Sequence, residues 1–528
     1  MSSIVVSDLA YAHPGGDLLF ESVSFKLPPS RHAGLVGANG VGKTTLLRVI
    51  AGTLEPAAGS ASVGDRALYM AQDVGTGQGT VRELLLSAAP SRIRDAGVAL
   101  LSAESDLARG DDSAGVRLGE AIGVWSDLGG YELEGQWDAA CRRIAGASLS
   151  DVGDRPSQTL SGGERKQLVL ELLFTSDAPV LLLDEPDNFL DIPAKRRLED
   201  RIRATKKTVL LISHDRGLLS AACDSILTLE GDGCWVHGAS YSSYPEARRR
   251  RQQLMGDRLE RWHQEEKRLR ELVRIFKERA KYSPDLTKRA NAFETRWKRF
   301  VDEGPPDPPV VDAQIRPRLR GGDSARRVIV LEDVAIDGLV ALLSDEIHFG
   351  ERVGLVGPNG TGKTHLMRLL AGEDVPHGGR FALGPRVSAG LFTQLNLRAE
   401  FDDATPLDVA SGRLGAIQPA MGALARYGLQ DAARRPCSTL SGGQRARLEI
   451  LCLELEGHNL LLLDEPTDNL DIESSEALES ALDGFEGTIV AVSHDRAFLR
   501  TLDRFLLLDA SGDVTMLPDP DRALAALS

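Results

Sequence analysis

The chain has 528 residues, too many for one compact core, and this length predicts two to four domains. Its composition is that of an ordinary globular protein, with 42% hydrophobic and 26% charged residues. The five cysteines form no CxxC pair, which argues against a disulfide framework, a zinc finger or an iron–sulfur cluster and fits a reducing cytosol. No apolar run approaches the roughly 18–20 residues needed to span a bilayer, so we expect no integral membrane segment. The net charge of −15 argues against a surface that coats nucleic acid, although a local basic element is compatible with it.

The first predicted element is a strand followed by a glycine-rich loop and an amphipathic helix, within residues 34–52. The loop reads Gly-x-x-x-x-Gly-Lys-Thr from Gly37 to Thr44, and in this setting the pattern predicts a phosphate-binding loop. Glycines let backbone N–H groups converge on an anion at a helix N-terminus. We expect Lys43 to neutralise the β- and γ-phosphates and Thr44 to bind Mg²⁺. A simple tight turn is the alternative for a single loop of this kind.

Two further apolar runs end in polar side chains. The run that ends in Asp184 and Glu185 predicts a buried parallel strand, whose C-terminal end lies beside the phosphate loop. Asp184 is expected to hold Mg²⁺ through water, and Glu185 to orient and polarise the attacking water. His214 follows the next apolar run and is expected to sense the γ-phosphate by hydrogen bonding. The Ser-His-Asp string around it is no protease triad, because three adjacent residues cannot meet head to head.

The middle of the chain, residues 241–327, differs from both flanks. Residues 246–303 carry 18 Lys and Arg against 11 Asp and Glu, a local net charge of +7. Apolar positions predict two antiparallel helices, over 246–281 and 286–303, with a heptad seam on the second. Ser283 is expected to cap the second helix and Pro284 to begin it. The predicted tip gathers cations around one aromatic residue: Lys277, Arg279, Lys281, Tyr282, Lys288 and Arg289. A solvated helix face is the alternative interpretation of these charges.

The second half of the chain repeats the first. Gln72 and Gln394 are 322 residues apart, whereas Leu160 and Leu440 are 280 apart, so the first copy holds 42 extra residues. We expect them to form an extra helical element within about 87–140. Each copy also has Leu-Ser-Gly-Gly, at 160–163 and 440–443, at the start of a basic helix. This helix start predicts a second anion contact, which is expected to serve the nucleotide held by the other copy.

In their order and repetition, these motifs are similar to those of the ATP-binding cassette (ABC) superfamily. The resemblance implies two α/β P-loop ATPase domains, each a parallel-sheet core with a helical subdomain, joined by a helical hairpin. It implies ATP and Mg²⁺ at two sites between the copies, with catalytic roles for Glu185, His214, Glu465 and His494. Site one would combine Gly37, Asn39, Gly40, Gly42, Lys43, Thr44, Thr45, Gln72, Asp184, Glu185 and His214 with Ser441, Gly442 and Gly443. Site two would combine Gly357, Asn359, Gly360, Gly362, Lys363, Thr364, Gln394, Asp464, Glu465 and His494 with Ser161, Gly162 and Gly163. Mg²⁺ would be held with ATP by Thr44, Gln72 and Asp184 at site one, and by Thr364, Gln394 and Asp464 at site two.

The tandem copies and basic linker resemble the ABC-F branch, whose members act on ribosomes. The residues after the two glutamates, Asp187 and Phe189 in the first copy and Asp468 in the second, resemble those of the macrolide-type resistance members. His13 stands where the branch has a tyrosine. The resemblance implies a cytoplasmic monomer whose 246–303 hairpin contacts large-subunit rRNA and tRNA. The expected domains are 1–240, 241–327 and 328–528.

Three functions follow as hypotheses. The leading one is a ribosome-bound ATPase that protects translation from large-subunit antibiotics or modulates elongation. The second is the ATP-binding subunit of a drug transporter with separate membrane subunits, which leaves the basic hairpin without a role. The third is an ATPase that acts on other nucleic acids. The sequence has neither the cysteine clusters nor the long coiled-coil arms of such proteins, which counts against this hypothesis.

Overall fold

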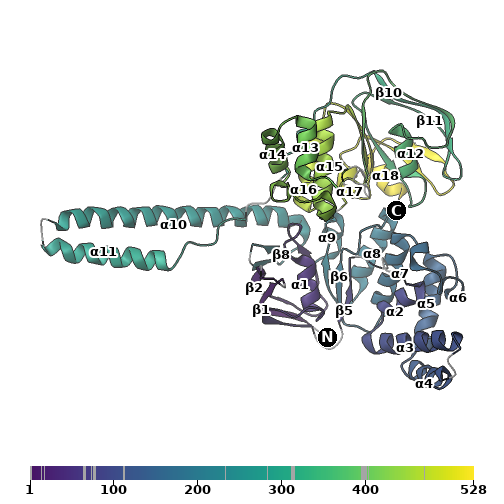
Figure 1. Ribbon diagram of the computed structural model, residues 1–528, viewed down its shortest axis with the longest axis horizontal. Helices are drawn as coiled ribbons and strands as arrows, with labels where there is room; N and C mark the ends of the chain where they lie inside the picture. Colours follow the sequence, from purple (N-terminus) through teal and green to yellow (C-terminus); the bar gives the residue numbers. More distant parts are fainter. Residues whose placement is uncertain are drawn as a thin grey trace. The chain divides into compact units, whose positions relative to one another are not determined.

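The computed structural model describes residues 3–527 except 14, 17, 64–66, 73, 75–78, 111–112, 232, 282–283, 311–314, 394–400, 402 and 469. The chain forms two compact units: Met1–Gly238 with Ala313–Ser528, and Ala239–Asp312. The first unit contains both α/β copies, which we call cassette 1 and cassette 2, and the second is a helical hairpin (Figure 1). In the described part of the chain, no helix is both long and apolar enough to cross a membrane.

Cassette 1 is built on a six-stranded sheet with the order β5-β6-β7-β3-β8-β9. Five strands are parallel and β9 is antiparallel. The strands β3, β6 and β7 are buried along their whole length, which explains why they are continuous apolar runs. The bounds are β3 His32–Val36, β5 Ala67–Met70, β6 Val180–Asp184, β7 Thr208–Ile212, β8 Ser225–Glu230 and β9 Gly233–His237.

A second sheet, β2-β1-β4, is antiparallel and packs with helix α1 (Lys43–Ile50) on the main sheet. Its strands are β1 Ile4–Ala12, β2 Leu18–Leu27 and β4 Ala58–Ser62. Leu46 and Leu47 of α1 are fully buried in a core shared with Phe20 of β2 and Leu182 of β6. This packing fixes the first turn of α1, and with it the preceding glycine loop.

Cassette 2 repeats this architecture with sheets β14-β15-β16-β12-β17-β18 and β11-β10-β13. The strands of its main sheet are β12 Arg352–Val356, β14 Ala389–Phe392, β15 Leu460–Asp464, β16 Thr488–Val492, β17 Arg504–Leu508 and β18 Val514–Leu517. The antiparallel sheet consists of β10 Arg327–Ile336, β11 Val340–His348 and β13 Gly378–Leu383. Its helices include α12 Lys363–Leu370, α15 Gly442–Glu456, α16 Ile472–Asp483, α17 Arg496–Leu499 and α18 Pro520–Ala526.

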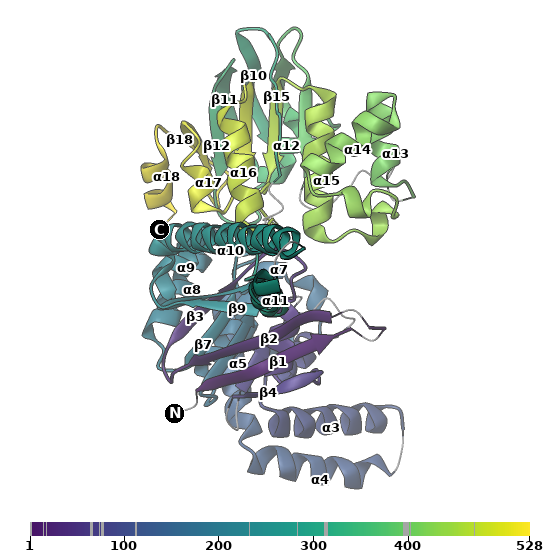
Figure 2. The same ribbon diagram turned by 90° about the vertical axis from the view of Figure 1, so that its left-hand side faces the viewer.

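The helical subdomains differ between the cassettes. Cassette 2 has α13 (Pro406–Leu414) and α14 (Ile417–Arg426) before α15. Cassette 1 has α2 Val81–Ser87, α3 Ser91–Ala108, α4 Ala114–Asp127, α5 Gly130–Ile144 and α6 Leu149–Val152 before α7 Gly162–Thr175, and then α8 Ile192–Ala204 and α9 Arg216–Ala222. Helices α3 and α4 lie side by side (Figure 2) and fall, with most of α5, in the range expected for the extra element.

Two tryptophans anchor this extra element. Trp125 of α4 and Trp137 of α5 are each 1% exposed, with ring centroids 6.2 Å apart. Gly97 of α3 and Gly130 of α5 leave the space that the Trp125 ring occupies, because a Cβ at either position would lie 2.9 Å or 2.1 Å from that ring. The packing of α3, α4 and α5 therefore depends on a few tight contacts.

The hairpin unit consists of α10 (Tyr244–Ala280) and α11 (Pro284–Asp302). Stacked rings join the two helices: Trp262 with Phe300 at 5.3 Å, and Phe276 with Phe293 at 4.8 Å. Helix α11 begins at the proline expected for this position, whereas its expected cap, Ser283, and the tip residue Tyr282 lie outside the described residues.

The end of the linker differs from the expectation. We expected it to extend to residue 327, but the structure assigns the chain from Ala313 onward to the first unit. Ile315 and Leu319 are 2% and 8% exposed in the core of cassette 2, and the Arg316 N–H donates to the Arg426 carbonyl at 2.8 Å. Two apolar residues among charged ones give too weak a pattern to predict from the sequence that this segment packs on cassette 2.

Candidate functional site

The glycine loop of cassette 1 leads from β3 into α1. Gly37 and Gly42 have φ angles of 151° and 104°, which favour glycine, and a Cβ on Gly42 would lie 2.9 Å from Leu19. The Lys43 ammonium donates to the carbonyls of Gly37 at 2.7 Å and Ala38 at 3.1 Å. Burial lowers the pKa of Lys43, so an anion in the loop would find a poorly solvated cation beside it.

The loop of cassette 2 has the same geometry. Gly357 and Gly362 have φ angles of 152° and 90°. The Lys363 ammonium donates to the Gly357 carbonyl at 2.8 Å and to the Pro358 carbonyl at 2.7 Å. Both loops therefore present a lysine and a helix N-terminus to the same point, which is the arrangement that favours a phosphate group.

A hydroxyl and a carboxylate meet beside each loop. Thr44 donates to Asp184 at 3.3 Å, and Thr364 donates to Asp464 at 2.9 Å. Both carboxyls are buried, and this burial raises their pKa. Such a set of hard oxygen atoms fits Mg²⁺, which keeps several waters and takes few protein ligands when phosphate oxygens complete its shell.

Glu185 lies in the turn after β6, with a left-handed φ of 48°. Its Oε2 accepts hydrogen bonds from Gln72 at 2.7 Å and from Asn188 at 2.5 Å. Burial, followed by the charges of Asp184 and Asp187, raises the pKa of Glu185 to about 7. A carboxyl with this pKa can take a proton from water near neutral pH.

Glu465 occupies the equivalent turn, with a φ of 52°, but its partners differ. Its Oε2 accepts from the backbone N–H of His494 at 3.0 Å, and its Oε1 is 3.5 Å from His494 Nε2. Burial, together with the like charge of Asp468, raises the pKa of Glu465 to about 8. The second histidine loop is thus held directly against its glutamate.

The two histidines are partly buried, and their imidazoles are neutral. Burial lowers the pKa of His214 to about 3 and that of His494 well below its ordinary value. Both ring nitrogens of His214 lack a hydrogen-bond partner, and His214 Nε2 is 3.9 Å from Glu185 Oε1. Because buried polar atoms are normally paired, the unpaired imidazole beside a cavity fits a ligand with oxygen atoms there.

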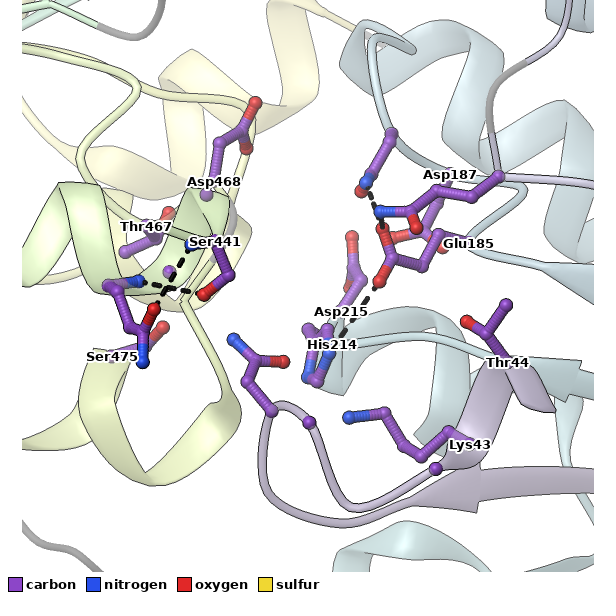
Figure 3. Close-up of a pocket in the computed structure, with 18 of the residues that line it drawn as sticks. Lys43, Thr44, Glu185, Asp187, His214, Asp215, Ser441, Thr467, Asp468 and Ser475 are labelled. Carbon is purple, nitrogen blue, oxygen red and sulfur yellow. Dashed lines mark hydrogen bonds and ion pairs between the residues drawn. The ribbon is translucent and has the colours of Figure 1, made fainter. Parts of the chain in front are cut away.

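Each glycine loop faces the Ser-Gly-Gly turn of the other cassette. A cavity of about 490 Å³ is lined by Lys43, Thr44 and His214 on one side and by Ser441 on the other (Figure 3). A second cavity of about 390 Å³ lies between the loop of Lys363 and the turn at Ser161. Each serine caps its helix, α7 or α15, by accepting from the backbone N–H three residues later.

Most residues predicted for the sites line these cavities. The first is lined by Asn39, Gly40, Gly42, Lys43, Thr44, Thr45, Gln72, Glu185, His214, Ser441, Gly442 and Gly443. The second is lined by Ser161, Gly162, Gly163, Asn359, Gly360, Gly362, Lys363, Thr364, Asp464, Glu465 and His494. Gly37, Gly357 and Asp184 line neither of these two cavities; the glycines shape the loops, and Asp184 accepts the hydrogen bond of Thr44. Gln394 falls outside the described residues.

The sequence reasoning missed two lysines near the sites. Lys166 of α7 donates to the Glu185 carbonyl at 2.6 Å and lies over the Phe189 ring, 5.4 Å from its centroid. Lys195 of α8 lines both cavities. No local motif marks these lysines. A position-by-position comparison of the copies at the 280-residue offset would have revealed Lys195, because Ser475 occupies its place in cassette 2.

Ion pairs join the two cassettes around the cavities. Arg216 forms a bidentate pair with Glu479, with one contact at 3.1 Å, and lies 3.4 Å from Asp495. At the equivalent place, Arg496 pairs with Glu199. The backbone N–H of Asn39 also donates to Asp471 across the interface at 3.2 Å. The cassettes therefore contact each other through charged groups from the same loops that carry the site residues.

Comparisons with known proteins agree with this geometry. The pattern of the family described as "ABC transporter" matches residues 20–188 and 341–468. A Mycobacteroides abscessus protein named "Antibiotic resistance protein" is 41% identical over 98% of this chain and 100% of its own length. The tylosin resistance ATP-binding protein TlrC of Streptomyces fradiae is 32% identical, over 91% of this chain and 92% of its own. The energy-dependent translational throttle protein EttA of Mycobacterium tuberculosis is 30% identical, over 94% and 90%.

The chain belongs to the ABC-F subfamily of ATP-binding cassette proteins. As in other members of this superfamily, its two cassettes are ATP-binding domains, and the protein is an ATPase. Among solved structures, the archaeal ribosome recycling factor aABCE1 shares the tandem fold, with a TM-score of 0.62 at 19% identity over 98% of this chain and 92% of its own. This last likeness concerns the fold alone.

Proposed function

We propose that this ABC-F ATPase binds two ATP molecules between its cassettes and hydrolyses ATP at both sites. The observation that carries the proposal is the pairing of each glycine loop with the other cassette's Ser-Gly-Gly turn around one cavity. The unpaired His214 imidazole supports a ligand with phosphate oxygens in the first cavity. The roles of the other site residues are assigned from their positions around each cavity.

The chain's own groups suffice to position and deprotonate a water molecule. Glu185 or Glu465 accepts the proton of the attacking water, while Lys43 or Lys363 stabilises the negative charge on the phosphates. The neutral His214 or His494 imidazole donates a hydrogen bond to the γ-phosphate. Mg²⁺ would be held by Thr44, Gln72 and Asp184 at site one, and by Thr364, Gln394 and Asp464 at site two, and would add positive charge at the phosphates.

We further propose that the protein acts on the ribosome in the cytoplasm, through large-subunit rRNA and tRNA, as a single chain whose two cassettes pair with each other. Relatives named for antibiotic resistance and for translational throttling support this function. The hairpin supports it physically, because residues 246–303 carry a net charge of +7 within a chain of −15. Such a local basic element attracts RNA phosphate groups. The expected outcome is protection of translation from a large-subunit antibiotic; the transporter alternative is not favoured, since these relatives are resistance and translation proteins.

Sedimentation with ribosomes tests this proposal. The Glu185→Gln/Glu465→Gln variant should bind ATP without hydrolysing it and co-sediment with ribosomes at least about tenfold better than the wild type with ADP. Equal sedimentation of the two would contradict ribosome action. In a filter-binding assay, the same variant should retain ATP. This measurement separates a failure to bind ATP from a failure to bind ribosomes.

A second arm tests the hairpin. Replacing Arg279, Lys281, Lys288 and Arg289 with Gln should weaken ribosome binding and reduce its dependence on salt, because fewer counterions are released. The matched control replaces four exposed arginines of cassette 2: Arg380, Arg434, Arg435 and Arg522. Both variants lose four charges, so an equal effect would mean that net charge alone, and not the hairpin, sets the affinity.

A further inference from the structure

The two cassettes differ at two buried positions between the ATP sites. At the 280-residue offset, Asp187 of cassette 1 corresponds to Thr467 of cassette 2, and Lys195 corresponds to Ser475. All four residues are less than 9% exposed. Cassette 1 therefore has an acid–base pair where cassette 2 has two hydroxyl groups.

Lys195 contacts both cassettes. Its ammonium is 3.1 Å from Asp215 Oδ2 in its own cassette, and it donates to the backbone carbonyl of His494, in cassette 2, at 3.3 Å. Burial alone would lower its pKa, but the carboxylates of Asp215, Asp187, Asp468 and Asp495 more than offset this and raise it. Two of these carboxylates belong to cassette 2, so the charged lysine is fully compensated only when the cassettes are together.

The histidine loop of site two is consequently held from several sides. Asn359 Oδ1 is 3.1 Å from His494 Nε2, and Asn359 Nδ2 donates to the Phe189 carbonyl of cassette 1 at 3.2 Å. The His494 N–H contacts Glu465, and its carbonyl contacts Lys195. This chain of contacts runs from cassette 1 to the glutamate of site two.

The contact that Lys195 makes with the His494 carbonyl has no counterpart at site one among the described residues. No hydrogen bond links Ser475 to His214, and neither ring nitrogen of His214 has a hydrogen-bond partner. Glu185 is held instead by Gln72 and Asn188 of its own cassette. The serine side chain in cassette 2 is also too short to span the distance that the four-carbon stem of a lysine covers.

We propose that Lys195 is a positioning residue that makes the two ATP sites unequal: by fixing the His494 loop to cassette 1, it makes site two the one that holds its nucleotide longer. This inference rests on the proposed composite sites. Lys195 lines both cavities, but in this scheme it acts through the His494 carbonyl and not by binding the nucleotide. Its ion-pair partner is Asp215, and the nearby carboxylate of Asp187 adds to the compensation of the buried charge.

Nucleotide release from a variant that cannot hydrolyse ATP provides the test. The Glu185→Gln/Glu465→Gln protein is loaded with the fluorescent analogue mant-ATP and chased with excess unlabelled ATP. Release should occur in two phases. The Lys363→Met substitution should remove the slow phase and Lys43→Met the fast one, which assigns the slow phase to site two.

The decisive variant is Asp187→Thr/Lys195→Ser, which gives cassette 1 the residues of cassette 2. Asp215, which loses Lys195, keeps Arg496 at 3.6 Å. The Asp187→Thr/Lys195→Ser variant should accelerate the slow phase at least about tenfold, the effect of losing one charge-assisted hydrogen bond, and change the fast phase less than about twofold. Asp187→Thr alone keeps the Lys195 contact and should keep the slow phase. Lys195→Arg keeps the charge and should also keep it, and thermal melting confirms that each variant is folded.

Other outcomes overturn the inference. Release in a single phase, equal acceleration of both phases, or an unchanged slow phase in the double variant would each contradict a role for Lys195 in site two. These results differ from a failure of the proposed sites themselves, in which the Glu185→Gln/Glu465→Gln protein would not retain mant-ATP at all.

Discussion

Glu185 and Glu465 adopt left-handed backbone angles, φ 48° and 52°, that are unusual for residues other than glycine. Each follows a buried strand whose neighbour accepts its N–H, at Ile212 and Val492. Backbone strain of this kind costs about 1–3 kcal/mol and persists where the surroundings enforce it. The same strain in both cassettes indicates that each carboxyl is aimed by its backbone.

The raised pKa values of Glu185 and Glu465 predict the pH dependence of hydrolysis. A general base works only when ionised, so activity should be lost as the pH falls through its pKa. In Glu465→Gln, where site one alone works, kcat/KM should fall with a midpoint near pH 7; in Glu185→Gln it should fall near pH 8. Profiles of steady-state hydrolysis measure both midpoints. Midpoints near those of free carboxyl groups, pH 4–5, would contradict this role, and the double variant controls for contaminating activity.

The individual site residues that the sequence predicted are those that stand in local patterns. Lys43 and Glu185 were predicted because a phosphate loop and a strand end each occupy a few consecutive residues. Lys195 and Lys166 were not predicted, because a lysine on an amphipathic helix is usually exposed to solvent. The groups that these two lysines contact come from other segments of the chain. Only folding brings Lys166 to the Glu185 turn and Lys195 to the interface.

The extra element of cassette 1 and the hairpin show which elements a sequence predicts. The hairpin was expected from a heptad seam, and Phe293 and Phe300 on that seam stack against α10. The offset between the copies predicted an additional helical segment but not its packing. That packing depends on Trp125 and on glycines that make room for it, which are contacts between separate helices.

Two glycines of α5 should respond in opposite ways to substitution by alanine. Gly130→Ala places a Cβ 2.1 Å from the Trp125 ring and should lower the free energy of unfolding by about 1–3 kcal/mol. Gly135→Ala on the same helix meets nothing within 4 Å and should raise it by up to about 1 kcal/mol. Denaturant unfolding of both variants tests this pair. A loss of the same size at both positions would show that the Trp125 contact is not the cause.

For the molecule as a whole, the sequence predicted only part of the interface between the cassettes. The serine–glycine turns predicted that the copies serve each other's nucleotide. The ion pairs Arg216–Glu479 and Arg496–Glu199 were not predicted, because their spacing of about 260–300 residues leaves no sequence pattern. They depend on how two folded surfaces meet.

A double-mutant cycle should detect coupling across this interface. Arg216→Gln and Glu479→Gln should each weaken mant-ATP binding, because each breaks a largely buried ion pair across the interface. The double variant should lose less than the sum of the two, by about 1–3 kcal/mol. The exposed pair Arg500–Asp521 within cassette 2 is the control and should show coupling below about 0.5 kcal/mol. Simple additivity at Arg216 and Glu479 would mean that the pair does not stabilise the closed arrangement.

The length of α10 has a mechanical consequence. Its 37 residues extend about 55 Å at the helical rise, and the stacked rings shared with α11 stiffen it against bending. A tilt of only about 5° at its first turn would therefore sweep the far end through about 5 Å, more than the separation of two stacked nucleobases. A lever of this kind would convert a small rotation at its base into a displacement that any partner bound at its far end must accommodate.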